Sequence, residues 1–172
     1  GITPEKRLEN FEKHMELVEN RDDLYVEYIT LLNLLGELEK AREYFMKASV
    51  GLDEPASAMF YNDQPPEMIF YQGLALQKLG EAEKAISKFN KLIAYGEKHL
   101  LDHVTIDYFA VSLPDFLIFD EDLDKRNVIH CRYLLGLGYL GLGKSEQAGN
   151  ELEQALKLDL NHMGVITHLK LV

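Results

Sequence analysis

The chain lacks several features that would point to particular protein classes. Cys131 is its only cysteine among 172 residues, so no disulfide can form within the chain. No apolar run approaches the ~18 residues that cross a bilayer, so we expect no membrane contact. Acidic residues outnumber basic ones by 29 to 18, and no cluster of Lys and Arg offsets the formal net charge of -11. An acidic surface repels phosphate backbones, so nucleic acid is not an expected partner.

The composition is otherwise that of an ordinary globular domain, with 47% hydrophobic and 27% charged residues. A length of 172 residues suits one domain, which we place at residues 1–172. The opening Gly1-Ile2-Thr3-Pro4 has neither an initiator Met nor a signal-peptide pattern. We therefore expect a longer parent protein, and the localisation stays open.

A helical hairpin is indicated at residues 129–161 by the spacing of large, small and aromatic residues. The pattern comprises Arg132, Leu135, Gly136, Tyr139, Gly143, Ala148, Leu152 and Ala155. This is the spacing of a tetratricopeptide repeat. Gly136 and Ala148 suit a close crossing of two helices, and Gly143 can adopt the positive φ of a helix-ending turn.

Two further hairpins follow the same pattern less strictly. One spans residues 22–50 with its turn at Gly36, and the other spans residues 66–96 with Gly73 at the crossing and its turn at Gly80. The turns are 44 and 63 residues apart, against a repeat of about 34 residues. The repeats are therefore interrupted by insertions.

The fold class predicted is all-α, a tetratricopeptide-like α-solenoid with about nine to eleven helices and no sheet. Thr3 and Pro4 are expected to open a first helix that runs to about Asn20. The remaining expected segments are an insertion at 51–65 with a short helix at 56–61, an insertion at 97–128 with a helix at about 100–111, and a capping helix at 162–172.

Four phrases carry a more specific resemblance: Arg21–Tyr25, Asn62–Pro66, Ile69–Leu76 and Ile106–Asp115. They resemble the C-terminal tetratricopeptide region of a family of large bacterial proteins. In that family a domain of unknown function, similar to the galactose-mutarotase β-sandwich, precedes the repeats. The resemblance covers nearly the whole chain. It implies a multidomain, carbohydrate-related context and offers no catalytic residue in this region.

Three groups of residues could suggest metal or nucleophilic chemistry. His99 and His103 are spaced i, i+4, but the zinc-protease Glu and a third ligand are missing. The Asp residues at 120, 122 and 124 mimic the start of a calcium loop whose sixth and twelfth positions are here Lys125 and Cys131, so that motif is rejected. Cys131 is best interpreted as a small buried hydrophobe. We therefore predict no enzyme activity, no cofactor and no metal.

The candidate binding surface is the concave face, which the first helix of each tetratricopeptide hairpin lines. Its candidate residues are Phe70, Tyr71, Leu74, Tyr133 and Leu137, with Tyr108 and Phe109 from the long insertion. We expect Tyr108, Phe109 and Phe116 to fill or line this apolar groove, because such patches are seldom left uncovered. The alternative is that the insertion forms an extra repeat-like layer and the groove stays open. The face carries no cationic fork for a carboxylate.

Two functions remain open at this point. The first is a non-enzymatic scaffold that docks a protein partner or the preceding domain of its own chain. The second is a helical module that completes a carbohydrate-binding or carbohydrate-active site on an absent N-terminal β-domain. The oligomeric state is not indicated.

Overall fold

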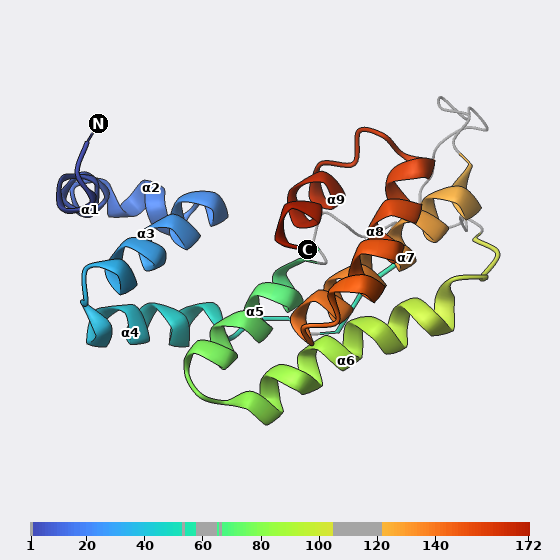
Figure 1. Cartoon of the computed structure of the whole chain (residues 1–172), viewed down its shortest axis with the longest axis horizontal. Helices are drawn as coiled ribbons and strands as arrows, with labels where there is room; N and C mark the ends of the chain where they lie inside the picture. The colour runs from blue at the N-terminus through green and yellow to red at the C-terminus, as the bar shows by residue number, and fades with distance from the viewer. Residues whose placement is uncertain (1, 53, 58–64, 66, 105–121) are drawn as a thin grey trace, which may run out of the picture.

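The computed structural model describes residues 2–52, 54–57, 65, 67–104 and 122–172. Within these ranges it contains nine α-helices and no strand. The helices are α1 (Pro4–Glu12), α2 (Met15–Glu19), α3 (Asp22–Leu34), α4 (Leu38–Ala48), α5 (Glu67–Lys78), α6 (Ala82–His99), α7 (Leu123–Gly141), α8 (Ser145–Leu158) and α9 (Met163–His168). A short 3-10 turn, Leu169–Leu171, follows α9. The fold is therefore an all-α, tetratricopeptide-like solenoid, as predicted (Figure 1).

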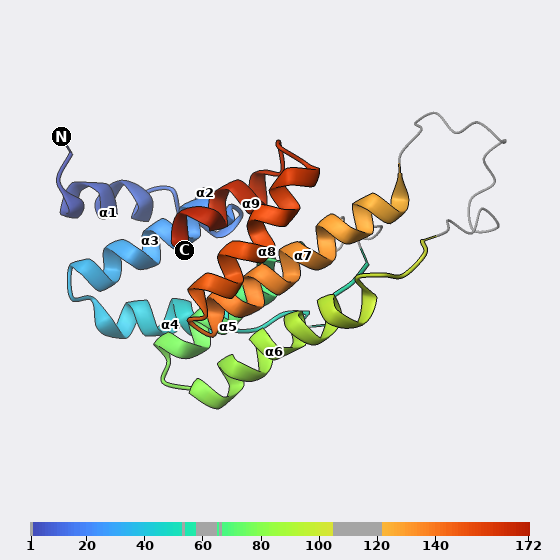
Figure 2. The same cartoon turned by 45° about the vertical axis from the view of Figure 1, so that its right-hand side comes forward.

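Three antiparallel hairpins, α3–α4, α5–α6 and α7–α8, form the body of the chain (Figures 1 and 2). Two residues after each first helix stands a glycine with positive φ: Gly36 at 78°, Gly80 at 80° and Gly143 at 71°. After each glycine, the next amide donates to the carbonyl five residues earlier, as Lys144 does to Tyr139. This is the Schellman arrangement, which satisfies carbonyls left over at a helix end. The predicted turns are confirmed.

The second helices of the three hairpins share a buried alanine in their first turns, and the two helices of a hairpin cross where one side chain is small. Ala41, Ala85 and Ala148 stand five residues after the turn glycines, and all three are buried. A Cβ placed on Gly136 would lie 2.6 Å from Leu152, and one on Gly73 would lie 2.4 Å from Phe89. Real Cβ contacts are longer, so both glycines are required for the predicted tight crossings.

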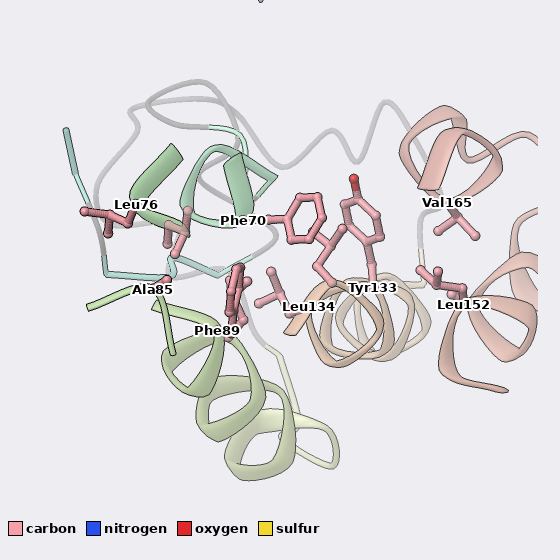
Figure 3. Close-up of a cluster of buried hydrophobic side chains, with 12 residues drawn as sticks. Phe70, Leu76, Ala85, Phe89, Tyr133, Leu134, Leu152 and Val165 are labelled. Carbon is pink, nitrogen blue, oxygen red and sulfur yellow. The ribbon is translucent and has the colours of Figure 1, made fainter. Parts of the chain in front are cut away.

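The helices bury two separate hydrophobic clusters. The N-terminal cluster, from α1 to α4, is centred on Tyr28, Leu32 and Ala41. The C-terminal cluster, from α5 to α9, includes Phe70 and Phe89 (Figure 3). The hairpins α5–α6 and α7–α8 pack closely on each other, whereas the N-terminal part meets the rest mainly where α4 touches α5.

Several segment predictions differ from the structure. Thr3 caps α1 as expected, but the first helix breaks after Glu12, and α2 begins at Met15, so that both pieces pack on α3. Ala56 and Ser57 are not helical, and residues 58–61 lie outside the described residues. Residues 100–104 are not helical either, because α6 ends at His99, whose carbonyl accepts the Asn127 side-chain amide.

Candidate functional site

The concave groove between α5 and α7 is filled by α9, as far as the described residues show. Phe70 and Tyr133 are 1% exposed and Leu137 is 0% exposed. In Figure 3, Phe70 reaches from α5 toward Tyr133 of α7. His168 of α9 stands edge-on to Phe70, with ring centroids 5.4 Å apart. These three predicted site residues therefore belong to the core while α9 is docked.

His168 ties α9 to both groove helices. Its Nδ1 lies 2.7 Å from the Gly164 carbonyl oxygen, which can only accept, so Nδ1 carries the proton. The Tyr71 hydroxyl, 3.1 Å from Nε2, can then donate to that nitrogen. The Tyr133 hydroxyl lies 3.1 Å from Nδ1. Burial lowers the pKa of His168, so the neutral ring is favoured.

Gly164 lets α9 approach this closely. A Cβ at that position would lie 2.6 Å from the Tyr133 hydroxyl oxygen. The sequence predicts that residues of the long insertion cover this groove. Tyr108, Phe109 and Phe116 lie outside the described residues, so their part stays a prediction. The cover that the structure shows is the capping helix.

A second hollow, which none of the described residues fills, lies between the α3–α4 hairpin and α5. Its volume is about 900 Å³. Its lining is mainly aromatic and aliphatic: Tyr25, Ile29, Phe45, Ala48, Val50, Met68, Tyr71, Leu74 and Ala75, with Glu19, Thr30, Asn33, Lys47, Gly51, Pro65, Gln72 and Lys78 completing it. We call this hollow the inter-hairpin cleft. It brings together two of the predicted site residues, Tyr71 and Leu74.

The cleft lies where two repeats would normally close on each other. Aligned on the turn glycines, α5 residues Ala75 and Lys78 correspond to Gly138 and Gly141 of α7. In α7 those glycines meet α6 so closely that a Cβ on Gly138 would lie 2.8 Å from a backbone oxygen. The larger side chains of α5 cannot approach α4 in that way, so a gap remains.

Buried Gln72 helps to keep the hairpins apart. It takes the place that Leu135 has in α7, and both ends of its side-chain amide are used. Its Nε2 donates to the Leu52 carbonyl at 3.0 Å, and its Oε1 accepts from Lys88 at 2.9 Å. The chain after α4 is thereby fixed against α5, and a Cβ on Gly51 would lie 2.9 Å from Nε2.

The charged groups of the cleft differ in their pairing. Lys47 lies 3.1 Å from Glu43 and 4.0 Å from Glu19. Lys78, at the C-terminal end of α5, is exposed and has no ion pair with any residue that the structure describes. One cation is therefore available at the α5 end.

The two histidines considered for metal binding turn to different carboxylates. His99 Nδ1 lies 2.6 Å from Asp102, and His103 Nδ1 lies 2.8 Å from Asp124. Asp124 also accepts the Val104 amide, which with the histidine lowers its pKa. Across the described residues, no group of three or more His, Cys, Asp or Glu side chains is placed to hold a metal ion.

Two other buried groups serve packing. Burial raises the pKa of the Cys131 thiol to about 12, so the reactive thiolate is strongly disfavoured. His130 Nε2 donates to the Ala56 carbonyl at 2.8 Å and holds Ala56 against α7. Burial lowers the pKa of His130 to about 4. The sequence pattern did not reveal this contact, which joins residues 74 positions apart.

Comparison with known families finds a tetratricopeptide repeat at residues 129–162, which is the hairpin with the clearest repeat spacing. Tetratricopeptide repeats generally mediate protein–protein interactions, and their fold is typically a non-enzymatic scaffold. No solved structure gives a significant match. No described helix combines the length and the apolar character that crossing a bilayer requires.

Proposed function

We propose that this chain is a non-enzymatic scaffold that docks a polypeptide in the inter-hairpin cleft. The polypeptide belongs either to a separate protein or to another domain of the same parent protein. The observation that carries the proposal is the cleft itself: about 900 Å³ bounded mainly by apolar side chains from α3, α4 and α5. Burying apolar surface is the main driving force of protein association, and exposed apolar hollows mark interaction sites.

The location also favours the cleft over the concave groove of the two C-terminal hairpins. In that groove α9 already contacts Phe70 and Tyr133, so a ligand would have to displace it. The inter-hairpin cleft needs no such displacement. The carbohydrate-related alternative rests on the family resemblance.

The experiment is a selection from a random peptide library against the immobilised full chain. A cleft-blocked variant, Thr30→Trp, supplies the counter-selection, because Thr30 lines the cleft and is exposed, so the larger ring should enter the cleft without disturbing the core. Gln147→Trp, at an exposed position of α8, is the matched control.

We expect peptides that bind the native chain and Gln147→Trp equally and bind Thr30→Trp at least about tenfold more weakly, a loss of about 1.4 kcal/mol. Circular dichroism should show the same helix content for all three proteins. A selection that yields no binder, or only binders indifferent to Thr30→Trp, contradicts the proposal.

A further inference from the structure

We infer that the polypeptide taken by the inter-hairpin cleft is an amphipathic α-helix with an acidic residue close to Lys78. This inference rests on the proposed function, since it specifies the form and charge of the docked segment. It follows from the polar groups that the cleft offers, from the shape of its walls and from the charges at its ends.

The first reason is the supply of hydrogen bonds. The cleft walls are mainly helices, whose backbone amides and carbonyls are already paired within each helix. Asn33 gives its side-chain amide to the Ile29 carbonyl, and Gln72 uses both ends of its side chain. An extended segment would bury backbone groups without enough partners, which is costly. A helix satisfies its own backbone and needs only apolar contacts.

The second reason is the shape of the walls. On α3, Tyr25, Ile29 and Asn33 follow one another at i, i+4 spacing, and on α5 Met68, Gln72 and Ala75 follow at i, i+4 and i+3. Residues at these spacings lie along one face of each helix, and another helix can pack between two such faces. A helix about 10 Å across with a rise of about 1.5 Å displaces roughly 120 Å³ per residue, so about 900 Å³ holds about two turns.

The third reason is charge. Lys47 is already paired with Glu43 and Glu19, whereas Lys78 has no ion pair with a described residue. A carboxylate on the docked helix would neutralise Lys78 at the cleft edge. The apolar face and this one acidic position together define the partner segment.

The test uses fluorescein-labelled peptides of about 14 residues, a length at which an isolated helix is only marginally stable, so that helix formed on binding can be detected. The parent peptide carries Leu at i, i+3, i+4 and i+7, Ala and Gln elsewhere, and one Glu in a terminal turn. One partner peptide has Pro in its centre, and a second has Lys in place of Glu. Binding to the full chain is measured by fluorescence anisotropy, and peptide helicity by circular dichroism.

We expect the parent peptide to bind and to gain helicity, and the Pro peptide to bind at least about tenfold more weakly. Lys78→Glu should lower the affinity for the Glu peptide about two- to fivefold and raise the affinity for the Lys peptide. This is the size of effect expected for one exposed ion pair. Lys98→Glu, an equal charge reversal at an exposed site on α6, should change neither.

If the parent and Pro peptides bind equally tightly, the docked segment is not required to be helical and that part of the inference is refuted. If Lys78→Glu leaves the affinities of the Glu and Lys peptides unchanged, the acidic position is refuted. Library peptides that bind the cleft without becoming helical would leave the proposed function standing and refute this inference alone. A dimer of the free chain that Thr30→Trp converts to monomer would assign the cleft to a second copy and also refute it.

Discussion

Replacing Gly73 by Ala tests the packing between α5 and α6. The new Cβ would lie 2.4 Å from Cε1 and 2.7 Å from Cζ of Phe89. Phe89 is fully buried, and Gly141 of α7 crowds the same ring, so the ring has no nearby space. Overpacking of this kind costs about 1–3 kcal/mol, while replacing a helical Gly by Ala returns about 1 kcal/mol. We expect a net destabilisation of about 1 kcal/mol, or roughly 2–4 °C in Tm.

The decisive measurement is a double-mutant cycle with Phe89→Leu. The smaller side chain removes the clash, so Gly73→Ala should become stabilising in that background, with a coupling of about 1–3 kcal/mol. Urea unfolding followed by far-UV circular dichroism measures all four proteins. Gly149→Ala on α8 is the control, where the nearest contact, the terminal Val172, is 3.3 Å away. The same effect of Gly73→Ala in both backgrounds would refute the argument.

Four further outcomes are expected. Gly143→Ala should lower the free energy of unfolding by about 1–2 kcal/mol because φ is 71° there; an unchanged urea midpoint would count against the turn. The pKa of His130 falls from 6.5 to about 4 on burial, so acidification from pH 6.5 to 4 should remove about 3 kcal/mol of stability, and His130→Gln should flatten that slope in urea titrations. Cys131 should stay unlabelled by Ellman's reagent in the native chain and react after unfolding; prompt native labelling contradicts its burial. His168→Ala should speed hydrogen exchange in α9 selectively, and equal exchange rates would show that its tyrosine contacts do not hold the helix.

The turns could be predicted from the sequence because their chemistry is local. Positive φ is nearly confined to glycine, so Gly36, Gly80 and Gly143 mark the three helix ends without any knowledge of packing. The close crossings at Gly73 and Gly136 could be predicted as well, since a missing side chain at a fixed distance from the turn indicates that two helices cross there.

The groove cover and the cleft depend on contacts between distant segments. His168 meets Tyr71 across 97 residues, and periodicity within α9 does not say which surface it covers. The sequence does contain a signal of the cleft. When the hairpins are aligned on their turns, Gln72 and Lys78 stand where the last hairpin has Leu135 and Gly141. A comparison of the hairpins position by position, rather than by their consensus, could have found it.

Among the described residues the core divides into an N-terminal and a C-terminal cluster, so we expect two cooperative folding units. Regions with fewer shared contacts open at lower free energy than the rest of a protein. Amides of α3 and α4 should then exchange with solvent by a local opening that leaves α6 to α8 protected. Because the cleft is bounded by both units, a relative motion about the α4–α5 contact would change its width. A ligand that touches both walls must restrict that motion, so part of its binding energy is used to order the protein.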